Sequence, residues 1–101
     1  MSDELVISEA EGTITLPAGT LARIVARAAE QTDGVRVRKP RRAVDVEVSG
    51  ESASVTLRLT ARYGTVLPNV AEDVQRGVAG ALEQMCGLEV RNVDVAIEEL
   101  V

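Results

Sequence analysis

Residues 44–59 read VDVEVSGESASVTLRL, and this stretch decides the fold. Apolar and polar residues alternate on both sides of Gly50-Glu51, which is the pattern of two strands that each bury one face. A two-residue loop that begins with glycine is typical of a type II′ β-hairpin. Such a loop places Val46 opposite Val55, so the loop and the apolar pattern predict the same register.

A helix is expected on each side of this hairpin. Apolar residues recur at helical spacing from Leu21 to Ala29, after a start signal at Pro17 and before the stop signal Asp33-Gly34. The second helix is expected to begin at Pro68-Asn69 and to end at Gly87. Its predicted apolar face consists of Val70, Val74, Val78, Ala81, Leu82 and Met85.

Three further strands complete the prediction, at residues 13–16, 35–38 and 88–97. The last should bulge at Arg91-Asn92, where the alternation of apolar residues slips by one position. The order strand, helix, three strands, helix, strand predicts an α+β fold. It would be a two-layer sandwich, with two amphipathic helices on one face of a mostly antiparallel sheet. We expect a single domain over residues 12–101 and a flexible acidic arm over residues 1–11.

The composition argues against catalysis. The chain of 101 residues has no histidine, one cysteine and one aromatic residue, so it lacks the commonest general base and any multi-ligand His/Cys zinc site. Cys86 lies at a helix C-terminus, where the dipole disfavours a thiolate, and is expected to be a small packed residue. Asp45 and Glu47 share one sheet face and are expected to pair with Ser54 and Arg58. We expect no enzyme, no cofactor and no metal.

The charge is unevenly distributed. Five of the 11 basic residues fall within residues 36–42, which contain no acid. The remaining 94 residues carry a net charge of −10, because six basic residues there face 16 acidic ones. One interpretation is a solvated strand end and loop. The other is a docking patch for an acidic protein or for anionic headgroups. The candidate partner-binding residues are Arg36, Arg38, Lys39, Arg41 and Arg42.

Two other features leave alternatives open. Gly77-Val78-Ala79-Gly80 matches the GxxG string of KH domains, and with the basic segment it makes a nucleic-acid-binding protein the alternative function. The acidic remainder and the absence of an aromatic stacking platform count against it, and close helix packing also explains these glycines. Tyr63 is either a packing anchor beneath the second helix or, if it is exposed, a residue that binds a partner.

Three stretches carry a family resemblance. Residues 63–75, which read YGTVLPNVAEDVQ, resemble a YGxxIPxVAxxVQ motif, and residues 85–95 are similar to an MTGLxVxxVNV ending. The opening strand and helix, at residues 12–16 and 24–29, and the Gly34-Val35 step fit the same pattern. The family is the alkaline shock protein, or envelope stress response, family of Gram-positive bacteria. Its motif positions with a structural role here are Gly34, Gly64, Pro68 and Gly87.

The sequence also departs from this family. Cys86 stands where threonine is usual, and the segment after Gly34 is shorter and more basic than in many members. The resemblance implies a non-enzymatic cytoplasmic protein. Some members gather beneath the membrane by binding a small membrane-anchored partner, and some self-assemble. We therefore expect a stress-related interaction module that forms homo-oligomers or docks on such a partner, and is peripheral at the inner face of the membrane. No apolar run approaches the ~20 residues of a membrane span.

Overall fold

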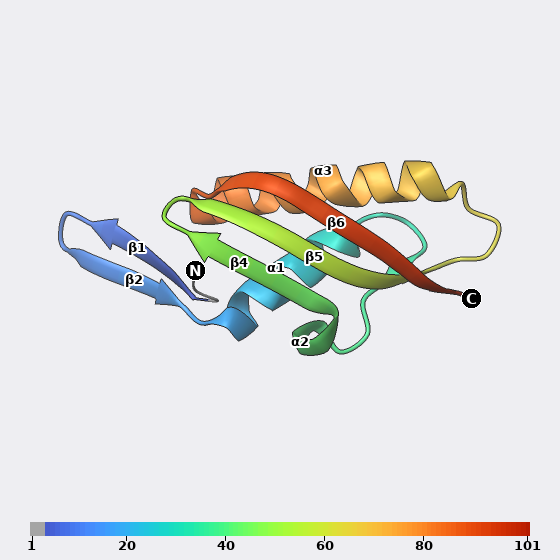
Figure 1. Ribbon diagram of the computed structural model, residues 1–101, viewed down its shortest axis with the longest axis horizontal. Helices are drawn as coiled ribbons and strands as arrows, with labels where there is room; N and C mark the ends of the chain where they lie inside the picture. The colour runs from blue at the N-terminus through green and yellow to red at the C-terminus, as the bar shows by residue number, and fades with distance from the viewer. Residues whose placement is uncertain (1–3) are drawn as a thin grey trace.

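The computed structural model describes residues 4–101 of the chain. It is an α+β structure with nine elements (Figure 1). In order these are β1 Leu5–Glu9, β2 Gly12–Leu16, α1 Ala18–Ala29, β3 Val35–Arg36, α2 Pro40–Ala43, β4 Val44–Ser49, β5 Ser52–Ala61, α3 Leu67–Cys86 and β6 Glu89–Leu100.

Strand β5 lies at the centre of a four-stranded sheet. It pairs antiparallel with β4 in the predicted register, with Val46 opposite Val55, so the hairpin prediction is confirmed. Strand β6 pairs with β5 in parallel over the whole length of β5, so the short β3 and β4 share the opposite edge. The sheet is therefore mixed. The parallel pair is possible because α3 provides the long crossover that two parallel strands require.

The predicted bulge in the last strand is confirmed at Arg91. Val90 pairs with Ala53 and Asn92 with Ser54, so Arg91 is the extra residue. A second irregularity, at Glu98, has no counterpart in the sequence prediction, because the exposed residues after Ile97 give no alternating signal. The first bulge keeps the apolar residues on both sides of it directed toward the helices.

The first strand does not join this sheet. β2 pairs with β1 in a separate antiparallel hairpin, which projects from one end of the molecule (Figure 1). Residues 5–9 thus form a paired strand, where the sequence predicts a flexible arm. The side chain of Leu5 is buried and holds the base of this hairpin against the core. Met1–Asp3 lie outside the described residues, so the boundary between arm and domain stays a prediction.

Helices α1 and α3 cover one face of the sheet, and the core lies between them and the strands (Figure 1). Helix α1 ends at Ala29, before the expected stop at Asp33-Gly34, and a turn at residues 32–35 follows it. Gly87 caps α3 in the left-handed conformation, as predicted. The buried stripe of α3 is Val70, Val74, Val78, Leu82 and Cys86.

Met85 is not part of that stripe, so its predicted place in the core is wrong. Its side chain is 66% exposed, whereas Cys86 is buried. The i, i+4 row that continues through Leu82 reaches Cys86 and leaves Met85 at the border with α1. The expected packing of Cys86 is confirmed, and burial raises the pKa of its thiol.

Candidate interaction site

The basic segment folds into three different local structures. Arg36 lies in β3, where it pairs with Thr60 of β5. Lys39 adopts a left-handed conformation with φ 48°, and Pro40 then begins the single turn of α2. Arg41 and Arg42 lie on this turn, which the buried side chain of Ala43 anchors to the core. The sequence predicted a strand end and a loop here, because one helical turn is too short to show periodicity.

Two contacts hold α2 on the edge of the domain. A guanidinium N–H of Arg58, on β5, donates to the backbone carbonyl of Arg42. The guanidinium of Arg41 lies against the first turn of α1, where its Cζ is 3.5 Å from the position that a Cβ on Gly19 would occupy. The backbone of α2 is thus fixed to the sheet, and the side chains of Arg41 and Arg42 remain exposed.

Ion pairing separates the basic residues into two groups. Four arginines make ion pairs: Arg38 with Glu99 at 3.6 Å, Arg58 with Glu98 at 3.9 Å, Arg62 with Asp33, and Arg76 with Glu72 and Asp73. Within residues 4–101, the basic side chains with no ion pair are Arg23, Arg27, Arg36, Lys39, Arg41, Arg42 and Arg91. All of these except Arg91 lie on α1, on β3, on α2 or directly before α2. The expected pairing of Asp45 with Arg58 is not among these pairs, since Arg58 contacts Glu98 instead.

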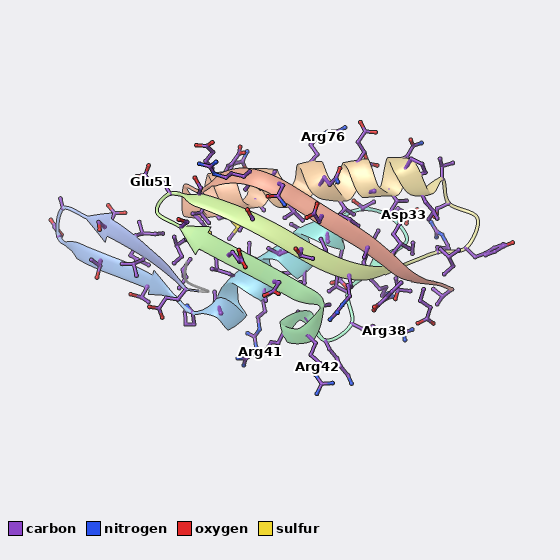
Figure 2. All side chains as sticks on the ribbon, in the orientation of Figure 1. Asp33, Arg38, Arg41, Arg42, Glu51 and Arg76 are labelled. Atoms are coloured by element: carbon purple, nitrogen blue, oxygen red, sulfur yellow. The ribbon has the colours of Figure 1, made fainter. Side chains whose placement is uncertain are left out.

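We call Arg36, Arg38, Lys39, Arg41 and Arg42 the basic edge. Figure 2 shows Arg38, Arg41 and Arg42 along the β4 and α2 border of the domain, away from Arg76 on α3. All five side chains are exposed. The ion pair of Arg38 leaves four of the five cations without a partner in the described chain, so this border presents uncompensated positive charge.

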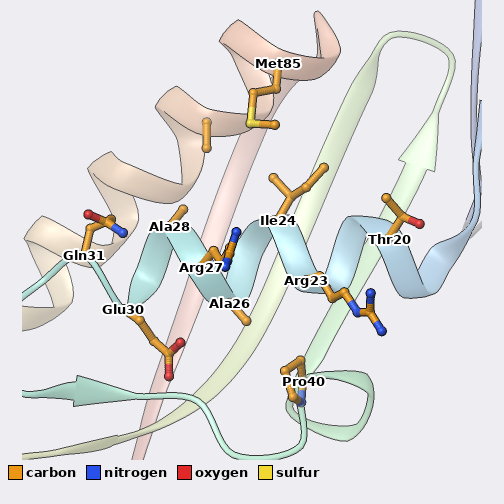
Figure 3. A pocket seen from close by; sticks show the side chains of 11 residues that line it. Thr20, Arg23, Ile24, Ala26, Arg27, Ala28, Glu30, Gln31, Pro40 and Met85 are labelled. Carbon is orange, nitrogen blue, oxygen red and sulfur yellow. The ribbon is translucent and has the colours of Figure 1, made fainter.

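A groove lies beside the basic edge, between α1 and α3. It has a volume of about 650 Å³. Ile24 and Ala28 point toward α3, and Met85 points back toward α1 (Figure 3). Arg23 and Arg27 line it from α1, and Pro40 joins it to α2. This groove was not predicted from the sequence. The apolar stripe on α1 is wider than the surface that the sheet covers. This width was the signal in the sequence that some apolar residues of α1 stay uncovered.

Tyr63 lies at the end of the sheet, just after β5. Its side chain is 78% exposed, so the predicted packing beneath the second helix is wrong. Its backbone N–H donates to the carbonyl of Val101 at 2.6 Å, which fixes the chain while the ring points into solvent. The structure does not bring Tyr63 together with Arg41 and Arg42, which lie on α2. Because the ring is exposed, Tyr63 remains a candidate residue for binding a partner.

The motif glycines have backbone roles. Gly34, Gly64 and Gly87 have φ values of 82°, 93° and 68°, which side-chain-bearing residues rarely adopt. Pro68 lies in the first turn of α3. Gly77 and Gly80 lie inside α3 and form no loop. Gly77 faces α1, since a Cβ there would be 3.4 Å from the carbonyl oxygen of Ala28, whereas a Cβ on Gly80 would meet nothing within 4 Å.

A family model matches residues 35–101, and it describes the alkaline shock protein 23 family, with a cell envelope-related function. The chain belongs to this alkaline shock protein family. The match confirms the resemblance read from the motifs, and it includes β3, the basic edge, the central hairpin, α3 and β6. No curated protein matches the chain. In residues 4–101 no helix is long and apolar enough to cross a membrane.

Solved structures of MamM CTD resemble this alkaline shock family chain in fold. A triple variant and a variant described as a copper form are each 15% identical to it, and a single variant is 16% identical. All three have a TM-score of 0.55 and cover 80% of this chain. The matches span 93% to 95% of the MamM CTD chains. At this identity the likeness shows the α+β fold alone.

Proposed function

We propose that the chain is a non-enzymatic interaction module of the cell envelope that docks through its basic edge on an acidic segment of a membrane-anchored protein. The observation that carries the proposal is the gathering of cations without ion pairs on β3 and α2. Arg58 on β5, Arg62 directly after β5 and Arg76 on α3 each have an acid beside them in the fold. The basic edge has no acid within its own segment, so an acidic partner would supply the missing charge.

The chemistry of the chain supports a non-catalytic role. There is no histidine, and the single cysteine is buried with a raised pKa, so its thiol is protonated and inaccessible at neutral pH. The exposed acids on the outer face of the sheet, such as Asp45 and Glu47, lie in solvent rather than in a closed cleft. General acid–base catalysis would need at least one of them shielded.

Self-association is the second candidate. The chain itself carries the complementary charge, because Asp45, Glu47 and Asp94 are exposed on the sheet face that no helix covers. The basic edge of one copy could contact this face of another. Such a head-to-tail contact uses two different surfaces and gives rings or open filaments rather than a closed dimer.

Affinity capture from crosslinked cells tests the proposal. The variant is Arg41→Glu with Arg42→Glu, and the control is Arg76→Glu with Arg91→Glu, which changes the net charge equally on other surfaces. We expect the first variant to lose a membrane-anchored partner by about ten-fold or more, and the control to retain it. Tyr63→Ala, run in parallel, tests whether the exposed ring belongs to the same interface.

Three other results would reject docking on a membrane-anchored partner. Equal capture by both charge variants would show that the basic edge is only solvated surface. Salt-sensitive self-association of the purified protein, abolished by Arg41→Glu with Arg42→Glu, would favour the second candidate. Steeply salt-dependent binding of RNA or DNA by the purified chain would favour the nucleic-acid alternative.

A further inference from the structure

We propose that the groove between α1 and α3 binds the apolar face of an acidic amphipathic helix from a partner protein. This inference rests on the proposed function and specifies the chemistry of the partner. It adds a second surface, lined by Ile24, Ala28 and Met85, to the basic edge.

Part of the apolar surface of α1 and α3 is not covered by the rest of the chain. Helix α1 directs Leu21, Val25 and Ala29 into the core, where each is fully buried. Ile24 and Ala28 belong to the same apolar stripe but are only half-buried, because they face the space beside α3. Met85 faces them from α3 and is 66% exposed. Three apolar side chains from two elements therefore line one groove at the surface, which is typical of a site that buries a partner's side chains.

The groove has the length that a short helix needs. The two helices touch where Gly77 meets the carbonyl of Ala28, and α3 has no side chain at Gly80 to obstruct the neighbouring surface. Helix α1 has 12 residues. At 1.5 Å per residue it offers a binding surface ~18 Å long, about three helical turns of a ligand. An amphipathic helix of that length presents apolar residues at i, i+3 or i+4, and i+7, the spacing that helix-in-groove recognition uses.

The rim of the groove carries more basic than acidic side chains. Arg23 and Arg27 line the groove, are exposed, and make no ion pair within residues 4–101. The acid at one end of the groove, Glu30, is directed by a hydrogen bond from the backbone N–H of Val37 to its Oε2 at 3.0 Å, and the two arginines outnumber it. The rim therefore favours a helix with carboxylates beside its apolar stripe. Pro40 extends this rim toward the cations of α2.

The structure argues against helix α3 of a second copy as the occupant. The long helix of the chain that carries exposed acids, α3, has Glu72 and Asp73 on its surface, but its own apolar stripe is buried against the sheet. It could fill the groove of another copy only by leaving its own core. A helix from a different protein has no such cost.

A fluorescent peptide of about four helical turns tests the proposal. The probe carries leucines at helical spacing with glutamates on both flanks, and a matched peptide carries lysines in place of the glutamates. Fluorescence anisotropy measures the binding of each peptide to the full chain. We expect saturable binding of the acidic peptide and at least roughly ten-fold weaker binding of the lysine peptide.

Two pairs of variants locate the binding. Met85→Glu changes the groove, and Val66→Glu is its control, since Val66 is 61% exposed at the opposite end of α3. Arg23→Glu with Arg27→Glu reverses the rim, and Arg76→Glu with Arg91→Glu is its control. We expect each groove variant to weaken binding of the acidic peptide about ten-fold or more, and the controls to change it less than about two-fold. Circular dichroism checks that every variant is folded.

Several outcomes would overturn the groove proposal. These are an absence of saturable binding, equal binding of both peptides, equal loss in the groove variants and their controls, and binding to anionic vesicles with no binding to the peptide. If the groove variants bind like wild type while Arg41→Glu with Arg42→Glu still loses its partner in cells, the groove proposal fails and the proposed function stands. If the peptide results hold but the cellular partner persists, the basic edge is the part that is wrong.

Discussion

The two glycines inside α3 have nearly the same sequence context but opposite surroundings, and this predicts opposite effects of one substitution. A glycine in a helix interior is ~1 kcal/mol less favourable than alanine. A Cβ on Gly80 meets nothing within 4 Å, so Gly80→Ala should gain that full amount. In a domain of this size ~1 kcal/mol corresponds to an increase of roughly 4 °C or more in Tm. A Cβ on Gly77 would be 3.4 Å from the carbonyl oxygen of Ala28, so Gly77→Ala should gain less.

Valine makes the contrast sharper. A Cβ on Gly77 already lies at contact distance from the carbonyl oxygen of Ala28, and the γ carbons of Gly77→Val add bulk there with little rotamer freedom in a helix to relieve it. Forcing atoms into a packed contact costs about 1–3 kcal/mol, which exceeds the gain in helix propensity. Gly80→Val faces open space and should be neutral or slightly stabilising. The two valine variants should therefore move stability in opposite directions.

Urea unfolding followed by circular dichroism measures the four variants against wild type, with the m value as a check that compactness is unchanged. The order expected is Gly80→Ala most stable and Gly77→Val least stable. Equal stabilities for the two valine variants would refute the reasoning, because they would show that α1 does not pack against Gly77.

Two further predictions follow from burial and from register. The buried Cys86 thiol has a raised pKa, so the unfolded chain loses its proton first, and stability should fall as pH rises through and above its ordinary value of 9.0. Unfolding of wild type and Cys86→Ala across that range should show a smaller fall in the variant, and parallel curves would contradict the assignment. Deleting Arg91 removes only the bulge and leaves residues 93–97 in phase, whereas deleting Asp94 turns Val95 and Ile97 to the outer face. The first deletion should cost less stability than the second, as urea midpoints will show, and equal losses would contradict this register.

The hairpin was predictable because its information is local. The two-residue loop at Gly50-Glu51 and the alternation on both sides of it specify one register, and the structure has that register. The bulge at Arg91 was predictable for the same reason, since the slip in alternation lies within one strand. The cap at Gly87 follows from glycine's freedom at positive φ.

The features that could not be predicted depend on distant parts of the chain. Strand β2 pairs with β1 and not with an edge of the four-stranded sheet, and no local pattern in residues 12–16 indicates that choice. Whether Met85 or Cys86 is the buried residue depends on where α1 lies beside the end of α3. Tyr63 is exposed because its backbone, rather than its ring, is held by the chain end at Val101.

The candidate site was predictable only in part. The basic residues were visible as a run without acids, but their common placement with Arg23 and Arg27 depends on α2 folding next to α1. The groove was not visible, because a half-buried residue such as Ile24 has the same pattern in the sequence as a buried one. Sequence periodicity marks the apolar stripe of a helix, and only packing shows how much of it remains uncovered.

The charge arrangement on α2 is difficult to explain by folding alone. Like charges in neighbouring positions repel, so the basic edge destabilises the folded chain to the extent that no acid compensates it. Asp45 lines the same small cavity as Arg41, but within residues 4–101 neither Arg41 nor Arg42 has an ion pair such as those of Arg62 and Arg76. The buried side chain of Ala43 and the hydrogen bond from Arg58 to the carbonyl of Arg42 hold α2, and neither contact depends on the charges of Arg41 and Arg42. Reversing Arg41 and Arg42 should therefore leave the stability of the fold unchanged or slightly raised while removing the interaction, and this separation distinguishes a binding surface from a structural one.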